Sequence, residues 1–326
     1  TESDLEIATL EWLEELGYSI AFGPNLAPDG EAPERESYRD VFLVERLRSA
    51  IARINPTIPA ESQEEAIKQV INVAYSNPSL LATNHAFHKM MVEGVDIEYR
   101  RPDGTIAGDK VYLLDARNTA DNDWLAVNQY TVIENNHNRR PDVVLFVNGI
   151  PLAVFELKNP ADQNATVKSA FHQIQTYKDQ IPSLFTYNAL CIISDGLDTR
   201  VGALTADFER FMKWRTMDDD KVAPASIPKM EVLLKGVFAK ERLLDIVRNF
   251  IVFTPMGKET VKVLTAYHQY HATNKAVART LEATAEKGDR RCGVVWHTQG
   301  SGKSLTMTFY AGKIIQVLDN PTLVVL

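Results

Sequence analysis

The sequence predicts an α/β protein in which a mixed sheet flanked by helices precedes the beginning of a second α/β unit. Three observations support this prediction. Strand, strand, helix and strand signals follow one another over residues 141–194. A polar segment interrupted by two prolines occupies 216–228, and further along a glycine-rich turn joins a short apolar run to a helix. We place a domain boundary in this polar segment and expect domains at 1–222 and 223–326.

The first domain is expected to begin with helices and to continue with strands. Apolar residues at helical spacing over 4–16 predict an amphipathic helix that ends at Gly17. Residues 23–37 are rich in Pro, Gly and acids, which predicts a loop. Further elements are expected as helices at 38–54, 61–76 and 167–180, a hairpin of 95–100 with 109–115 around the turn 101–104, and strands at 128–134, within 141–158 and at 189–194.

The second domain is expected to alternate helices and strands around the glycine-rich turn. Its elements are predicted as helices at 241–250 and 261–285, a short buried strand at 292–296, a helix at 304–318 and a last strand at 322–326. A buried strand that runs through a glycine-rich turn into a helix is the setting of many phosphate-binding loops.

Composition and charge exclude several classes of protein. A balance of 45% hydrophobic and 24% charged residues argues against disorder, and no apolar run approaches the roughly 18 residues of a membrane span. The net charge of −8 argues against binding nucleic acid by charge alone, because that affinity depends largely on Lys and Arg neutralising phosphates. Cys191 and Cys292 lie in apolar stretches and are expected to be buried free thiols in a reducing cytoplasm.

Two carboxylates and a lysine on neighbouring strands form the first candidate site. Asp142 opens one strand, and Glu156 and Lys158 lie two residues apart on the next, so they share a face. Asp142 and Glu156 offer the hard oxygen ligands that suit Mg²⁺. A lysine beside the ion can orient the attacking water and screen the charge that develops in the transition state. This set predicts phosphodiester hydrolysis.

The hairpin that carries these residues must satisfy a geometric condition. A two-residue turn at 148–149 would place Asp142 opposite Phe155, and Glu156 would then face the other side of the sheet. Asp142 and Glu156 share an ion only if the loop has three residues or the hairpin contains a β-bulge, and we predict one of these. The alternative is that the charged residues are solvated strand ends. The surrounding apolar run 151–157 argues against it, because unpaired charges are costly to bury there.

These motifs resemble those of a known nuclease family. Asp142, Glu156-Leu-Lys158 and Gln173-Ile-Gln-Thr-Tyr177 resemble the PD-(D/E)xK motifs. The stretch 140–159, together with 128–130 and 193–196, looks like the R (restriction and motor) subunit of type I restriction enzymes. The resemblance implies a restriction-endonuclease-like mixed sheet flanked by helices. It also implies that Gln173 and Tyr177 contact DNA or support the nuclease site.

Two points about this resemblance stay open. Gln173 and Tyr177 are four residues apart on one helix, so they could also be one face of an ordinary amphipathic helix. An acidic residue on the first helix often adds to this nuclease fold. Glu6 is a candidate for it, without an assigned role.

The second candidate site is a glycine-rich loop between the predicted strand at 292–296 and the helix at 304–318. Its backbone N–H groups and helix N-terminus would wrap phosphate, Lys303 would reach the β- and γ-oxygens, and Ser304 would ligate Mg²⁺. The loop residues are Gly300, Ser301, Gly302, Lys303 and Ser304. His297 stands where the strict P-loop pattern has glycine, a variation typical of helicase-like motors. The loop therefore predicts ATP binding at the beginning of a RecA-like P-loop motor domain.

Gln269 is the candidate for recognising adenine. Residues 267–270 resemble the glutamine motif of superfamily 2 helicases, and a side-chain amide can both donate to and accept from the adenine edge. The alternative is an exposed glutamine on an amphipathic helix. Two weaker candidates remain. His85 and His88 are expected to be surface or packing residues. Residues 211–215 could dock the two domains but are more simply an ordinary helix end.

The resemblance implies a subunit that moves duplex DNA with ATP and cuts it with Mg²⁺, together with methyltransferase (modification) and specificity subunits. No membrane partner is expected. An ATPase motor also needs acidic residues that hold Mg²⁺ and arginines from a second lobe. Beyond Ser304 the sole acid is Asp319, so we expect a fragment that hydrolyses ATP poorly or not at all. Two alternatives are a nuclease–helicase fusion of DNA repair and a catalytically silent module that binds DNA or a partner.

Overall fold

A mixed β-sheet lies at the centre of the computed structural model, which describes residues 2–76, 79–101, 103–159, 166–218, 220–257, 259–319 and 321–322. Among these residues the sheet has six strands in the order β1-β4-β7-β8-β9-β10. β1 pairs with β4, and β8 with β9, in parallel, and the other neighbours are antiparallel. The strands are β1 (Ser19–Phe22), β4 (Trp124–Asn128), β7 (Val143–Val147), β8 (Ile150–Leu157), β9 (Leu190–Ser194) and β10 (Thr199–Gly202). The predicted mixed sheet flanked by helices is therefore confirmed.

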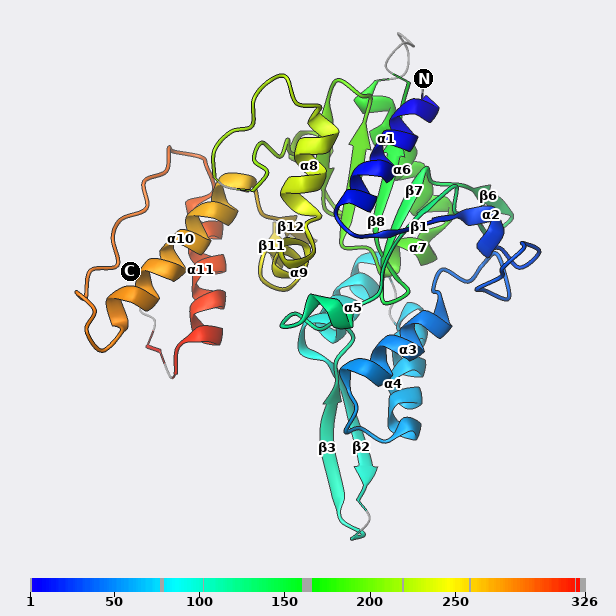
Figure 1. Cartoon of the computed structure of the whole chain (residues 1–326), viewed down its shortest axis with the longest axis horizontal. Helices are drawn as coiled ribbons and strands as arrows, with labels where there is room; N and C mark the ends of the chain where they lie inside the picture. Colours follow the sequence, from blue (N-terminus) through cyan, green and yellow to red (C-terminus); the bar gives the residue numbers. More distant parts are fainter. Residues whose placement is uncertain are drawn as a thin grey trace.

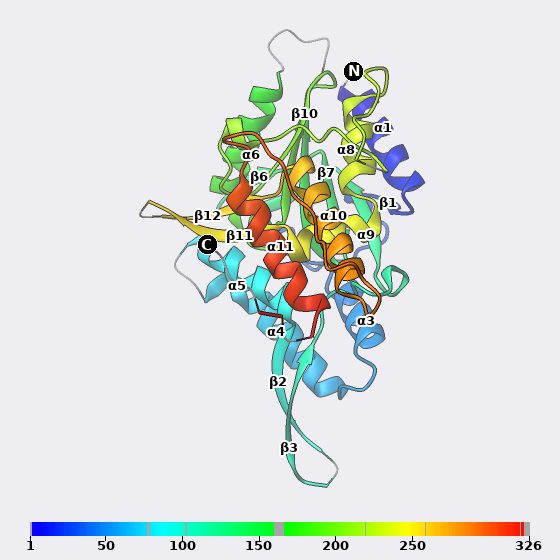
Figure 2. The same ribbon diagram turned by 90° about the vertical axis from the view of Figure 1, so that its left-hand side faces the viewer.

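Helices cover both faces of this sheet (Figures 1 and 2). α1 (Glu2–Glu15) packs on β1, β4 and β8 and contacts α8 (Lys229–Val237), while α6 (Val167–Gln180) packs on β8 and β9 from the opposite face. Every residue of β7, β8 and β9 is buried, as expected for strands covered on both sides. The short helices α2 (Gly23–Leu26) and α7 (Pro182–Thr186) lie at the margins of the sheet.

A helical layer and a long hairpin extend from one end of the sheet (Figure 1). The helices are α3 (Val44–Ile54), α4 (Ala60–Asn72) and α5 (Leu80–Glu93), and the hairpin pairs β2 (Val95–Arg100) with β3 (Ile106–Val111). A smaller hairpin joins β5 (Val132–Glu134) to β6 (His137–Arg139). Short 3₁₀ turns occupy Val73–Tyr75, Thr119–Asp121 and Phe208–Arg210.

The C-terminal part is a hairpin and three helices that follow α8. These elements are α9 (Lys240–Asn249), β11 (Ile251–Met256), β12 (Glu259–Leu264), α10 (Tyr267–Thr284) and α11 (Lys303–Val317). α10 packs along α11, and α11 also contacts α9. The described part of 216–228 contains no helix or strand, and the division into domains at 222/223 stays a prediction. No helix in the described part of the chain is long and apolar enough to cross a membrane.

Several predicted elements differ from the structure because tertiary contacts override local sequence preference. The helix predicted at 38–54 begins only at Val44, because backbone bonds to Ile133 and Gly149 hold residues 38–43 out of the helix. The strand predicted at 128–134 is broken at Gln129, whose φ of +56° turns the chain. The loop at 23–37 contains α2, and β3 spans 106–111 rather than 109–115.

The region between 261 and 296 was predicted least well. Residues 261–264, expected as the start of a helix, form β12, because β11 lies beside them and completes a hairpin. Residues 292–296, expected as a buried strand, are irregular: no described strand pairs with them, and Val294 and Trp296 are 91% and 89% exposed. Cys292 is accordingly exposed, whereas Cys191 is buried as predicted, and both are free thiols. Most of the strand predicted at 322–326 lies outside the described residues.

Candidate functional site

A β-bulge in the β7–β8 hairpin sets the geometry of the carboxylate–lysine cluster. The turn has two residues, Asn148 and Gly149, with φ angles of +53° and +74°. The register shifts between Leu145 and Phe146, which leaves Leu152 as an extra residue on β8. As a result Val143 pairs with Phe155, one position further than a regular two-residue hairpin allows. The predicted bulge is confirmed, and the three-residue loop is not formed.

The bulge brings Asp142 and Glu156 to the same face of the sheet. Continuing the register by one residue places them opposite each other, and Asp142 Oδ2 accepts a hydrogen bond of 2.6 Å from the backbone N–H of Leu157. Both carboxylates are buried, with 8% and 2% of their surface exposed. Lys158 forms an ion pair with Glu156. Two acids and an ammonium group thus lie together at the end of β8.

Helix α6 adds Gln173 and Tyr177 to this cluster. Burial raises the pKa of the Tyr177 hydroxyl well above its usual value, and the negative charges of Glu156 and Asp142 and a hydrogen bond to Glu156 raise it further. A hydrogen bond from Gln173 acts in the opposite direction. The structure therefore places the glutamine–tyrosine pair beside the carboxylates, rather than on an uninvolved helix face. At neutral pH Tyr177 is a hydrogen-bond donor toward Glu156.

The donor set fits Mg²⁺ better than a metal that requires an all-protein site. In the described part of the chain no three His, Cys, Asp or Glu side chains come together to hold an ion. Mg²⁺ usually takes one or two carboxylates, keeps several waters and binds a substrate phosphate. Asp142 and Glu156 supply the two carboxylates. Glu6 lies apart from them, beside Asn128 and Gln129.

The glycine-rich loop has the backbone form expected of a phosphate-binding loop. Gly300 and Gly302 both have φ near +80°, and α11 begins immediately afterwards at Lys303. The Lys303 ammonium donates to the carbonyl oxygens of His297 and Thr298, at 3.2 and 3.3 Å. Ser304 is exposed in the first turn of α11. The helix N-terminus is thus available to an anion.

Gln269 is buried against this loop, so it is not the exposed helical glutamine of the alternative interpretation. Its Nε2 donates to Gly302 O at 3.0 Å, and its Oε1 accepts from Ala266 N at 2.9 Å. A pocket of about 510 Å³ opens beside it, lined by Gly300 to Gly302, by β12 and by Arg210. Gln269 and three of the predicted phosphate-binding residues therefore line a common pocket, whereas Lys303 lines a neighbouring one between α10 and α11.

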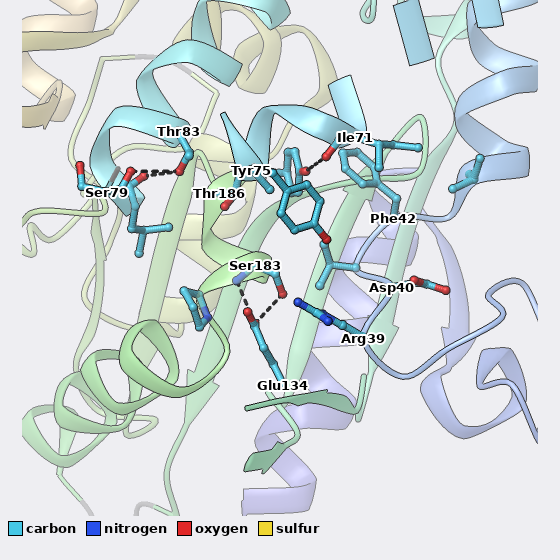
Figure 3. Close-up of a pocket in the computed structure, with 16 residues that line it drawn as sticks. Arg39, Asp40, Phe42, Ile71, Tyr75, Ser79, Thr83, Glu134, Ser183 and Thr186 are labelled. Atoms are coloured by element: carbon cyan, nitrogen blue, oxygen red, sulfur yellow. Dashed lines mark hydrogen bonds between the residues drawn. The ribbon is translucent and has the colours of Figure 1, made fainter. Parts of the chain in front are cut away.

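A separate pocket of about 270 Å³ lies between 39–44, α5 and α7 (Figure 3). Arg39 extends toward Glu134 and Ser183, and Ser183 donates to Glu134 through both its backbone N–H and its hydroxyl. None of the residues predicted from the sequence lines this pocket. No sequence motif marked it.

The weaker candidates prove to be packing residues. His85 stacks on Phe253 with ring centroids 4.1 Å apart, and His88 is buried, as expected for packing histidines. Residues 211–215 do not form a helix end as predicted. Trp214 packs on Tyr270 of α10 at 5.9 Å, so this segment joins the sheet region to the C-terminal part.

Comparison with known proteins gives matches to two families. The family described as type I restriction enzyme R protein N terminus matches residues 1–210, and the SWI2/SNF2 ATPase family matches residues 268–326. The chain is 41% identical to the type I restriction enzyme HindI endonuclease subunit of Haemophilus influenzae over 99% of its length, which is 31% of that protein. It is 37% identical, over 99% of its length and 32% of the relative, to the putative type I restriction enzyme MjaIXP endonuclease subunit of Methanocaldococcus jannaschii. The chain thus spans about a third of the length of these relatives.

Proposed function

Because the chain belongs to the R protein family of type I restriction enzymes, we propose that its carboxylate–lysine cluster cleaves duplex DNA with Mg²⁺. In the full-length protein this cleavage is coupled to ATP-driven DNA translocation. The observation that carries the proposal is the bulge at Leu152, which sets Asp142 and Glu156 on one face beside Lys158. A regular hairpin would separate the two carboxylates and leave no site for an ion.

The proposed reaction divides its roles among the clustered side chains. Asp142 and Glu156 hold Mg²⁺, which when bound supplies a Lewis acid for the scissile phosphate. Lys158 orients the attacking water and screens the charge that develops on the phosphate oxygens. The Tyr177 hydroxyl donates to Glu156 and fixes its orientation, and the Gln173 amide, bonded to Tyr177, supports this pair or contacts the DNA. Burial excludes bulk water and strengthens each of these interactions.

We propose that the glycine-rich loop and Gln269 form a second site, which binds ATP. Gly300, Ser301 and Gly302 present backbone N–H groups to the phosphates, Lys303 pairs with their charge and Ser304 ligates the accompanying Mg²⁺. Gln269 reads the adenine edge from the pocket beside the loop. Methyltransferase and specificity subunits would complete a cytoplasmic restriction complex. They would supply target recognition and much of the DNA affinity, since a net charge of −8 gives this chain no excess of Lys and Arg to neutralise phosphates.

Substitutions in the cluster test the proposal in the full-length protein assembled with its partner subunits. Glu156→Ala and Lys158→Ala are each expected to abolish breakage of supercoiled plasmid in the presence of ATP and Mg²⁺. Lys168→Ala, an exposed lysine on α6, is the matched control and should cut normally. Normal cutting by Glu156→Ala and Lys158→Ala would instead favour the catalytically silent, binding-only function. Co-purification with a methyltransferase separates a restriction complex from a nuclease–helicase of repair.

A further inference from the structure

Glu6 of α1 holds the turn that leads out of β4. Its Oε1 accepts a hydrogen bond of 2.7 Å from Asn128 Nδ2, and its Oε2 accepts one of 2.6 Å from Gln129 Nε2. Both carboxylate oxygens are therefore engaged by side-chain amides that are adjacent in sequence. Hydrogen bonds to an ionised carboxylate are shorter and stronger than those between neutral groups. Glu6 thus ties the first helix to one point of the central sheet.

This turn has a conformation that needs support. Gln129 has φ of +56°, a left-handed backbone that is unfavourable for a residue with a side chain. The preceding residue, Asn128, is fixed by its parallel pairing with Phe22 on β1. At Gly23 the backbone passes so close to the carbonyl groups of residues 128 and 129 that a Cβ would overlap them. The hydrogen bonds from the amides of Asn128 and Gln129 to the Glu6 carboxylate hold the same turn from the side of α1.

The turn is bonded directly to the candidate nuclease site. The backbone N–H of Gln129 donates to Asp142 O at 3.0 Å, and the side chain of Asp142 is held by the N–H of Leu157 at 2.6 Å. We propose that Glu6 is a positioning residue that acts through Gln129 to set the backbone of Asp142, and this rests on the proposed nuclease function. The hydrogen bonds of Glu6 are to amides and not to Asp142 or Glu156, and among the described residues no three His, Cys, Asp or Glu side chains come together to hold an ion. We therefore assign it a positioning role rather than a place among the ligands of the ion.

An exchange of partners distinguishes positioning from metal binding. Glu6→Gln keeps the shape of the side chain but removes the charge that strengthens both hydrogen bonds, and it turns one of the two acceptors into a donor that Asn128 or Gln129 can meet only by turning over its own amide. In the double variant Glu6→Gln/Gln129→Glu the amide and the carboxylate change places, so the hydrogen bond is restored with the same net charge. Glu11→Gln, on the exposed side of the same helix, is the matched control. All variants are made in the full-length subunit and assembled with its partners.

The expected result is loss and rescue of the nuclease rate. Partners that orient a metal-binding residue typically change affinity or activity by about 10- to 100-fold when removed, and we expect Glu6→Gln to lower the cleavage rate and raise the Mg²⁺ requirement by that factor. The exchanged double variant should recover most of the loss, and Glu11→Gln should show none. A single variant as active as wild type, or a double variant as impaired as the single, would overturn the proposal.

Hydrogen exchange gives a second readout that does not depend on cleavage. In Glu6→Gln the amides of the peptide covering 124–133 should exchange faster than in wild type, and the double variant should restore their protection. Unchanged exchange in Glu6→Gln would also overturn the proposed role of Glu6. Failure of the nuclease function itself would appear differently, as undiminished cleavage by Asp142→Asn whatever the exchange result.

Discussion

The two candidate sites of this chain are constructed in opposite ways. Asp142 and Glu156 are buried, lie on central strands and are fixed by the hydrogen bonds of the sheet. The glycine-rich loop is largely exposed, follows an irregular segment and is shaped by its own glycines, the first turn of α11 and a hydrogen bond from Gln269 of α10. A cluster gathered from two strands needs the correct register of a whole sheet. A glycine-rich loop of this kind needs only a turn, a helix N-terminus and a contact from one neighbouring helix, so it forms even where 292–296 pairs with no described strand.

One buried lysine links the C-terminal part of the chain, which carries the glycine-rich loop, to the part that carries the carboxylate cluster. Lys262 on β12 donates to Asn84 Oδ1 at 2.9 Å and to Asn188 O at 2.7 Å, both in the sheet region. Thr205 adds two bonds to the backbone of Lys262. β12 leads within five residues to Gln269 of the nucleotide pocket. The hairpin β11–β12 is therefore held against the part of the chain that carries the carboxylate cluster, although it lies on the C-terminal side of residues 216–228 and leads into α10.

The largest effect is expected from removing one charge of the nuclease cluster. Asp142→Asn keeps the shape of the side chain but weakens its hold on Mg²⁺, and we expect cleavage to fall by about 10³-fold, the upper range for removing one electrostatic group. ATP binding should stay at the wild-type level, because the P-loop shares no residue with this cluster. Plasmid nicking and nucleotide binding are measured on the same assembled preparation. Parallel loss of both activities would contradict the separation of the two sites.

The second prediction concerns the glycine-rich loop, where a substitution should weaken ATP binding. Lys303→Ala removes the ammonium that would pair with the phosphates, and we expect ATP affinity to fall by about 100-fold, since interactions between full charges contribute a few kcal/mol. Thermal stability should change little, because Lys303 is exposed and its hydrogen bonds among the described residues are to two loop carbonyls. Arg290→Ala, a nearby exposed residue, is the control. Undiminished ATP binding by Lys303→Ala would exclude this loop as the nucleotide site.

The chemistry of both sites could be predicted from the sequence because it depends on short spacings. Glu156 and Lys158 share a face through the period of a strand, and Gln173 and Tyr177 share one through the period of a helix. The need for either a bulge or a three-residue loop also followed from the sequence, by counting residues from the turn to Asp142. The position of the bulge at Leu152 could not be predicted. Both faces of this buried strand are apolar, so nothing in the sequence marks the residue that has no partner on β7.

Long-range contacts account for the elements that were predicted wrongly or missed. β1 and its pairing with β4 depend on contacts across more than 100 residues, and nothing in 19–22 marks that partner. Lys262 was included in a predicted helix, because its position between two valines gave no indication that its amine would be fully buried. The role proposed for Glu6 depends on Asn128 and Gln129 from a distant turn. The family resemblance pointed to Glu6 as a candidate and to 128–130 as a matching stretch, but nothing in the sequence connected the two.

The third prediction concerns Lys262 and the pH dependence of stability. Burial lowers the pKa of this lysine to about 7, so between pH 7 and its ordinary value of 10.5 the unfolded chain binds a proton that the folded chain does not. Stability should therefore rise with pH in that window, by roughly 2 kcal/mol between pH 7 and 9, and be independent of this group below pH 7. Urea unfolding of Lys262→Met should lack this rise. An equal slope in both proteins would show that Lys262 keeps its proton when folded.

The smallest effect is expected at the turn that sets the register of the nuclease cluster. Gly149 has φ of +74°, its carbonyl accepts from Leu43 N at 3.0 Å, and an added Cβ would overlap Leu43 O. Gly149→Ala should lower the unfolding free energy by about 1 to 3 kcal/mol, since it adds backbone strain and a clash. Gly104→Ala, at a similar φ but with open space around it, should cost about 1 kcal/mol or less and so isolates the clash. ATP affinity should be unchanged by either substitution, because the described hydrogen bonds of the glycine-rich loop are made within the loop, with α10 and with α11 rather than with the sheet. If Gly149→Ala weakens ATP binding as much as it lowers stability, the loop depends on the sheet after all, and the contrast between the two sites is lost.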